Sequence, residues 1–268
     1  MDTKQPQIVA RWVDLRQLWP ETEHGNIQFS CALSYLPTHE QDSVRRFHFR
    51  RDASTHLASL LLQHATITSL AQQQWCESSI TRSQSGRPSA SKPVAFDYSV
   101  SHHGSRVVIA VRNDKDIALS RRIGADLVDL SSAGTSHIDD FREVFAPEEC
   151  ASIAPDPSTP AQPVLLFSYW ALKEAYTKAL GVGLVTDLHS IVFSNVPNLT
   201  LSDLPYSDAI RCHRNGKSLP WRFELFMLDG GLLLAIATPL EGLLHPGEPT
   251  AVSPISLQDI LVSASTVF

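Results

Sequence analysis

The chain has 268 residues, of which 43% are hydrophobic and 19% are charged, so it can bury a sizeable core and is not mainly disordered. Its formal net charge of −6 argues against a general nucleic-acid binder. No apolar run approaches the roughly 20 residues of a membrane helix, and the first residues lack the apolar core of a secretory signal, so we expect a cytoplasmic protein without a membrane partner.

Charge distribution and cysteine spacing limit the kinds of ligand that we expect. Residues 1–120 carry 13 of the 22 Lys and Arg residues, whereas residues 121–268 carry 17 of the 28 Asp and Glu residues. An anionic ligand that meets a metal ion between two such parts would explain this pattern, and so would chance. The four cysteines are far apart in the sequence, which favours reduced structural thiols over a zinc site or a disulfide framework.

In the first 120 residues we expect three strands and one long helix. Residues 8–15 mix β-branched, aromatic and polar side chains, which is typical of a strand. Residues 52–74 are rich in Leu and Ala, with apolar side chains at helical spacing, and this pattern predicts a helix. Residues 96–100 and 107–111 are predicted to be strands on either side of a turn that Gly104 permits.

The second part of the chain is expected to repeat the mixture of strands and helices. Its predicted elements are a strand at 123–130, a helix at 138–153, a proline-rich loop at 154–163, a helix at 164–180 that ends at Gly181, strands of a final sheet at 191–193, 221–228 and 232–238, and an apolar stretch at 255–262 that packs back. We therefore expect an α+β protein of two halves, residues 1–120 and 121–268, that are not separable domains.

The predicted helix at 164–180 places charged residues on an aromatic face. Phe167, Trp170, Glu174 and Lys178 are spaced so that they share one side of a helix. An exposed Glu–Lys pair worth about 0.3–0.5 kcal/mol is one interpretation. However, a solvated pair would normally lie opposite the apolar stripe, so a functional role is the other interpretation.

The sequence IGADLVDL places an acidic residue on an apolar strand. A lone buried carboxylate is costly, and a metal ion would relieve the cost at Asp126. Asp129 is a competing candidate, and strand alternation puts it on the opposite face. A strand-end carboxylate in water remains the structural alternative.

Histidines and arginines suggest contacts to phosphate. His102 and His103 are adjacent on an extended segment and are poor joint metal ligands, but one of them could contact a phosphate. Arg82 and Arg87 flank a Gly–Pro turn, and guanidinium groups match two phosphate oxygens at once. A further cluster, which is usually a solvated face, contains Arg45, Arg46, Arg50 and Arg51.

Taken in order, these segments resemble the 4′-phosphopantetheinyl transferases of the surfactin-synthetase-activating type. The family has a GKP-like loop, an Asn-Ile-Ser-His-like strand end, a Gly-x-Asp strand and a Trp-x-x-Lys-Glu-(Ala/Ser)-x-x-Lys helix. The corresponding segments here are SGRP, SVSHHG, IGADLV and WALKEAYTK. The resemblance runs from about residue 36 to residue 184, and the motif spacing is closest to fungal and animal members that serve several carrier proteins.

The resemblance implies a role for each matching residue. The phosphates of coenzyme A would be bound by Arg51, Arg82, Arg87 and His102, with Ser101 nearby. Asp126 and Glu174 would hold Mg²⁺, or Mn²⁺, on the pyrophosphate, and Lys178 would contact the phosphate that is attacked. Lys173 would support either the helix or the nucleotide. Glu149 matches a glutamate of the family's middle motif.

The implied reaction is attack by a serine hydroxyl of an apo carrier protein on the β-phosphorus of coenzyme A, which releases adenosine 3′,5′-bisphosphate. Its catalytic residues would be Glu174, Lys178 and Asp126. Glu174 is also the nearest candidate for the base that takes the hydroxyl proton, directly or through a metal-bound water. The sequence leaves both routes open.

This chain departs from the family pattern in several places. Val128 stands where many bacterial relatives have a second acidic metal ligand. Glu40 and Ser43 stand where those relatives have lysines, which shifts the phosphate contact onto arginines. Arg87 replaces the loop lysine and keeps its charge. Ser99 stands where an asparagine is common, and nothing in the sequence explains this residue.

The resemblance also implies a fold and partners. The fold is α+β, with two similar halves related by a pseudo-twofold axis around the coenzyme A cleft, and members of this length are mostly monomers. The acceptors would be carrier domains of fatty-acid, polyketide and nonribosomal-peptide synthases and of aminoadipate reductase. Two alternatives are a non-catalytic module that binds coenzyme A or a carrier protein, weakened at Val128, and an interaction scaffold whose motifs are structural.

Overall fold

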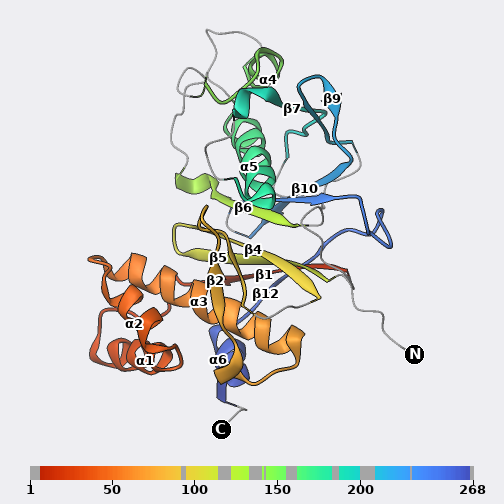
Figure 1. Ribbon diagram of the computed structural model, residues 1–268. Coiled ribbons are helices and arrows are strands. Elements are labelled where there is room, and N and C mark those ends of the chain that lie inside the picture. Colours follow the sequence, from red (N-terminus) through yellow and green to blue (C-terminus); the bar gives the residue numbers. More distant parts are fainter. Residues whose placement is uncertain are drawn as a thin grey trace.

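Two sheets lie face to face, and each is covered on its outer side by helices (Figure 1). The computed structural model describes residues 7–91, 95–113, 122–132, 141, 143–154, 162–182, 187–199, 209–229 and 231–265. Apolar side chains such as Trp12 and Val108 of the first sheet and Leu127 and Ile236 of the second pack together between the sheets. The protein is therefore an α+β protein, as expected.

The first sheet has the strand order β12-β1-β5-β4. Its strands are β1 (Ile8–Asp14), β4 (Phe96–His103), β5 (Arg106–Asn113) and β12 (Ala251–Pro254). Its helices are α1 (Glu23–Ser34), α2 (Thr38–Arg45), α3 (Arg50–Ala71) and α6 (Leu257–Ser265). The long helix α3 buries Leu57 and Leu61 in the same core as Ile109 of β5, which confirms the predicted helix and both predicted strands.

The last residues of the chain correct the expected division into halves. The predicted second half, residues 121–268, includes residues 251–265, but β12 pairs in parallel with β1 and α6 packs against α3. Ile260 of α6 is fully buried in the core of the first half. The predicted apolar stretch at 255–262 does pack back, because the first core has an apolar surface to cover there.

The second sheet has the strand order β10-β11-β6. Its strands are β6 (Gly124–Asp129), β10 (Trp221–Leu228) and β11 (Leu232–Pro239). Helix α5 (Pro163–Leu180) covers this sheet and ends at Gly181, whose φ of 69° explains the glycine. Each half thus sets three antiparallel strands beside one long helix, which fits the expectation of two similar halves.

Two predictions for the second half need correction. Strand β7 (Ile191–Ser194) does not join the final sheet, because it pairs with β8 (Arg211–Arg214), which in turn pairs with β9 (Lys217–Ser218). The Asn215–Gly216 turn between β8 and β9 has positive φ at both residues and is the hairpin signal that would have located this sheet.

The predicted helix at 138–153 is much shorter in the structure. Among its described residues, α4 covers only Pro147–Ile153. Glu149 accepts the backbone amide of Ala146, and this bond fixes the start of the helix. The described part of the chain leaves out residues 138–140 and 142 of this predicted helix. It also leaves out residues 155–161, which are most of the predicted loop at 154–163.

The remaining described elements are short. They are η1 (Trp75–Glu77), β2 (Ile80–Arg82), β3 (Pro88–Ala90), η3 (Leu130–Ser132) and η6 (Leu188–Ser190). Strands β2 and β3 form a hairpin whose loop contains the SGRP segment. No helix within the described ranges has the length and apolar character that a membrane span requires.

Candidate active site

Close packing of α5 on β6 brings three charged residues together. A Cβ at Gly124 would lie 1.9 Å from the carbonyl oxygen of Ala175, so only glycine allows the helix to approach the strand this closely. In this arrangement Lys178 Nζ lies 2.5 Å from Asp126 Oδ1. The interpretation of Glu174 and Lys178 as an exposed pair is therefore wrong, since the lysine pairs with a buried aspartate on β6.

Glu174 is the residue whose bonding is incomplete. Its Oε1 atom is buried and has no hydrogen-bond partner among the described residues. Burial raises the pKa of Glu174, the charge of Asp126 raises it further, and Lys178 partly opposes both effects. Two carboxylates beside each other, one with an unbonded buried oxygen, form an environment that favours a cation.

Ser101 connects this group to the first half. Its hydroxyl donates to Asp126 Oδ1 at 2.9 Å, and it accepts from Lys178 Nζ at 2.9 Å and from the amide of Leu127 at 3.2 Å. A hydroxyl has one donor and two acceptor positions, so all of its capacity is used. The structure thus brings Ser101, Asp126, Glu174 and Lys178 together at the joint between the halves.

Two cavities meet at this group. The smaller has a volume of about 350 Å³ and is lined by Ser101, Asp126, Val128, Glu174 and Lys178, with Phe167 and Trp170 as apolar walls. The larger has a volume of about 1080 Å³ and extends between α2, α3, the β2–β3 hairpin and β4. His102 and Lys178 line both cavities, so a ligand in the larger cavity can reach the carboxylates.

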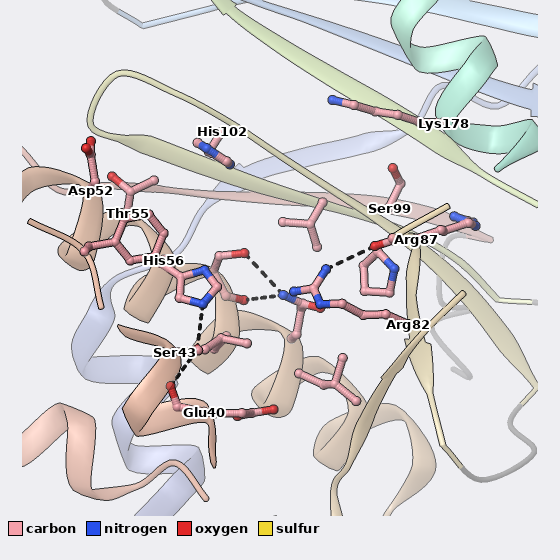
Figure 2. A pocket seen from close by; sticks show the side chains of 18 of the residues that line it. Glu40, Ser43, Asp52, Thr55, His56, Arg82, Arg87, Ser99, His102 and Lys178 are labelled. Carbon is pink, nitrogen blue, oxygen red and sulfur yellow. Dashed lines mark hydrogen bonds between the residues drawn. The ribbon is translucent and has the colours of Figure 1, made fainter. Parts of the chain in front are cut away.

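Most of the predicted phosphate-binding residues line the larger cavity. Figure 2 shows His102 and Lys178 on one side of it, Glu40 and His56 on the other, and Arg82 between them. Arg51 also lines it, and its guanidinium rests on the β4–β5 turn, 3.2 Å from the position that a Cβ at Gly104 would take.

Arg87 lines the same cavity, but much of its hydrogen-bonding capacity is already used. Its Nη2 atom pairs with Asp97 Oδ2 and donates to the carbonyl of Ile123 at 3.0 Å. Its Nη1 atom approaches the carbonyl of Tyr98 at 3.4 Å. This arginine therefore ties the hairpin loop to β4 and the start of β6, and it presents only its remaining edge to the cavity.

The surroundings of His102 lower its pKa. Desolvation by the cavity walls lowers its pKa, and the positive charge of Lys178 lowers it further. His103, the last residue of β4, also borders both cavities.

Lys173 does not have the position that contact with coenzyme A, one of its two predicted roles, requires. Its side chain is 0% exposed and lies inside the second core. Its ammonium pairs with Glu149 Oε2 at 2.7 Å and donates to the carbonyls of Leu188 and Ile191. Of the two expected roles, support of the helix is the one that this position allows, and Glu149 is its partner.

Asp129 does not compete with Asp126 for this site. Its carboxylate accepts from Arg106 Nη1 at 2.7 Å and from Ser131. Arg106 belongs to β5 of the first half and Asp129 to β6 of the second, so this pair is a link between the halves. The alternation of the strand predicted this opposite orientation correctly.

Some residues of the larger cavity were missed by sequence reasoning. His56 shares a hydrogen bond of 2.9 Å with Ser43, and burial together with the charge of Arg82 lowers its pKa. Glu40 is held by His64 at 2.8 Å. In the sequence, Glu40 and Ser43 stand out only as departures from the family pattern, and no motif singles out His56, which follows Arg51 by five residues on α3.

The geometry agrees with comparisons to known proteins. Residues 19–114 match the family model described as "4′-phosphopantetheinyl transferase, N-terminal", and residues 122–237 match "4′-phosphopantetheinyl transferase superfamily". The chain is 30% identical over 216 residues to an L-aminoadipate-semialdehyde dehydrogenase-phosphopantetheinyl transferase of Xenopus laevis, covering 77% of this chain and 69% of that protein. It is 32% identical over 204 residues to 4′-phosphopantetheinyl transferase 1 of Fusarium mangiferae, covering 67% and 69%.

Proposed function

The chain belongs to the 4′-phosphopantetheinyl transferase superfamily, and we propose that the residues gathered at the joint between its halves carry out the transfer. The protein is an enzyme that moves phosphopantetheine from coenzyme A to carrier proteins. The observation that carries the assignment of the site is the buried, unbonded Oε1 of Glu174, a residue that lines one cavity together with Asp126 and Lys178, next to the arginine-lined cavity.

The reaction forms one P–O bond and breaks another. The oxygen of the carrier serine attacks the β-phosphorus of coenzyme A, and the bond from that phosphorus to the bridging oxygen breaks. Adenosine 3′,5′-bisphosphate leaves with the bond's electron pair, and the hydroxyl proton passes to a base. Phosphoryl-type transfer depends mainly on positioning and on stabilising charge at the phosphate oxygens.

The three charged residues of the joint divide this work. Lys178 stands at the boundary of the two cavities and would neutralise a non-bridging oxygen of the phosphate under attack. Glu174 has a raised pKa, which makes its carboxylate a stronger proton acceptor for the weakly acidic hydroxyl. Asp126 holds Lys178 and Ser101 in place.

Asp126 and Glu174 fit a divalent cation. Their carboxylates are close enough for the charge of one to raise the pKa of the other, and Glu174 Oε1 has no protein donor among the described residues. Mg²⁺ commonly keeps several waters and needs few carboxylates, which agrees with Val128 at the place of a further acidic ligand. No cluster of three or more metal-ligating side chains occurs in the described ranges. When bound, Mg²⁺ would neutralise charge on the pyrophosphate.

The larger cavity suits the rest of coenzyme A. Its volume of about 1080 Å³ lies at the upper end of the usual range of ligand pockets, so it can hold more than a pyrophosphate. Arg51 and Arg82 provide positive charge along its length, His102 adds an imidazole that can donate a hydrogen bond, and Arg87 supports the loop beside them.

The acceptors are inferred from the names of relatives and from charge. Relatives from Xenopus laevis and Schizosaccharomyces pombe are named as transferases for L-aminoadipate-semialdehyde dehydrogenase, so an enzyme of that type is one proposed acceptor. Carrier domains of fatty-acid, polyketide and nonribosomal-peptide synthases are others. Their acidic surfaces would meet the mildly basic first half. We also propose that the enzyme acts as a cytoplasmic monomer.

Intact mass spectrometry of an apo acyl carrier protein tests this function. We expect the carrier to gain one phosphopantetheine group in the presence of the protein, coenzyme A and Mg²⁺, and to gain none after addition of EDTA. A carrier whose acceptor serine is replaced by alanine serves as the control. Absence of any gain on several unrelated carriers, from folded protein that binds coenzyme A, would contradict the proposal and favour a binding module.

A further inference from the structure

The edge strands of the two sheets lie side by side but belong to separate sheets. Strand β4 ends the first sheet and β6 ends the second, and the two strands are in contact without forming a backbone ladder. Side-chain oxygens of β4 accept the backbone amides of β6 instead. These bonds run from the amides of Ile123, Ala125 and Leu127 to Asp97 Oδ2, Ser99 Oγ and Ser101 Oγ, at 2.8, 3.0 and 3.2 Å.

The spacing of these bonds is regular. Each joins a residue of β4 to the residue 26 positions later in the chain, and all use alternate residues of both strands. Alternate side chains of a strand point to the same face of the sheet, so one face of β4 presents three acceptors in a row to β6. Strand β6 is an edge strand, so these amides have no partner strand, and β6 is buried along its length. The side chains of β4 supply the hydrogen-bond acceptors that buried backbone amides require.

The three side chains of this ladder differ in their other contacts. Asp97 also pairs with Arg87, and Ser101 bonds directly to Asp126 and Lys178. Ser99 is the middle member and is 3% exposed. Among the described residues, the amide of Ala125 is the partner of its hydroxyl, and Ala125 directly precedes Asp126 in β6.

We infer that Ser99 is a positioning residue that fixes β6 against β4 and so places Asp126 opposite Ser101 and His102. The arginines and His102 belong to the first half, while Asp126, Glu174 and Lys178 belong to the second. The reaction needs the residues of both halves at fixed distances from one another. The hydrogen bonds from β6 to β4 hold the two strands, and therefore these residues, in one relative position. This inference rests on the proposed function of those residues, and it explains why a small hydroxyl side chain occupies position 99.

Replacement of Ser99 by alanine removes the acceptor and keeps the strand. We expect Ser99→Ala to lower kcat for transfer about 10- to 100-fold, because a small displacement of reacting groups is costly. The Kd for adenosine 3′,5′-bisphosphate should stay within about twofold, since Ser99 is only 3% exposed and is not one of the proposed contacts of the nucleotide. The amide of Ala125 should exchange with solvent deuterium faster in the variant.

Two further variants separate positioning from simple loss of packing. Ser99→Thr keeps a hydroxyl and should recover most of kcat and the protection of the Ala125 amide. Ser168→Ala is the matched control, because Ser168 is also buried and, within the described part of the chain, its hydroxyl bonds to the carbonyl of Val164 in its own helix. If Ser99→Ala does not fold, Ser99→Cys carries the same test, because sulfur keeps the shape and is a weaker acceptor.

The outcomes distinguish this inference from the proposed function. Transfer by the wild-type protein tests the function itself. If the wild type transfers and Ser99→Ala transfers equally fast, the inference is overturned. It is also overturned if Ser168→Ala loses as much kcat as Ser99→Ala, or if Ser99→Thr stays slow although its Ala125 amide is protected.

Discussion

Two ion pairs on α5 have the same chemistry and different surroundings. Lys173 pairs with Glu149, and both side chains are 0% exposed; Lys178 pairs with Asp126, and 32% of the lysine side chain is exposed. Glu149 accepts two backbone amides besides its lysine, whereas the second pair lies beside the unbonded oxygen of Glu174. The Lys173–Glu149 pair, whose polar atoms are hydrogen-bonded within the protein, stabilises the fold. The Lys178–Asp126 pair, which lines a cavity beside an unbonded carboxylate oxygen, can bind a ligand.

The largest expected effect is at the incomplete site. We expect Glu174→Gln to lower kcat by at least about 100-fold, because it removes a charge that acts on the reacting groups. Single-turnover mass spectrometry of a carrier protein measures this loss. Glu148→Gln is the matched control, since Glu148 is exposed on α4. Equal activity of the two variants would remove Glu174 from the site.

The same variant should be more stable than the wild type at neutral pH. Burial raises the pKa of Glu174, so the folded state holds its proton more tightly than the unfolded state, and stability is lost as pH rises through the folded pKa. Glutamine removes this cost, so Tm should rise at pH 7, and the gain should shrink as pH falls. A lower Tm at pH 7 would mean that the glutamate charge is satisfied in the free protein.

Loss of the Lys173–Glu149 pair should lower the stability of the fold. Lys173→Met leaves Glu149 buried without its cation, which typically costs about 3–5 kcal/mol of the free energy of unfolding. Denaturant unfolding measures the loss, and Glu149→Gln combined with Lys173→Met should recover part of it. If Lys173→Met kept its stability and instead weakened coenzyme A binding, Lys173 would contact the nucleotide and not serve the fold.

Lys178 should show the opposite behaviour to Lys173. Because its side chain is partly exposed and Asp126 also bonds Ser101, Lys178→Ala should change stability by less than about 1 kcal/mol. We expect kcat to fall about 10- to 100-fold, through loss of a charge at the phosphate. Stopped assays of carrier modification and thermal unfolding of the same sample compare the two effects. A large loss of Tm with normal kcat would make the two pairs equivalent.

Arg51 extends the comparison to the larger cavity. Arg51→Ala should raise KM for coenzyme A about tenfold with little change in kcat, which is the signature of lost ground-state binding. Arg45→Ala is the control, because Arg45 is exposed and bonds to Asp42 and Gln41 on its own helix. Steady-state kinetics at varied coenzyme A tests both, and equal KM values would make the arginine cluster a solvated face.

The smallest expected effect concerns protonation of His102. Desolvation and Lys178 lower its pKa in the free protein, and a bound phosphate would raise it again. Binding of adenosine 3′,5′-bisphosphate should therefore take up a proton. Its affinity should increase, by up to about tenfold, as pH falls from the pKa of His102 in the complex to the lower pKa in the free protein. Calorimetry in two buffers measures the uptake. His102→Gln should flatten the pH dependence, and an unchanged profile would assign it to another group.

Sequence patterns predicted the local geometry of the residues in the proposed site. Helical spacing placed Glu174 and Lys178 on the face of Trp170, and strand alternation separated Asp126 from Asp129; the structure has both arrangements. The end of α5 followed from Gly181, whose backbone preference acts within one turn. These features depend on residues close together in the chain, so periodicity is enough to predict them.

Contacts between distant segments were decided only by the tertiary structure. The partner of Lys178 is Asp126 on β6, the partner of Lys173 is Glu149 on α4, and β12 returns to the first sheet. Periodicity fixes which side chains share a face, but packing fixes what that face meets. The ladder from β4 to β6 illustrates the difference: alternation gives Asp97, Ser99 and Ser101 one direction, and only the meeting of two sheet edges gives them the amides that they accept.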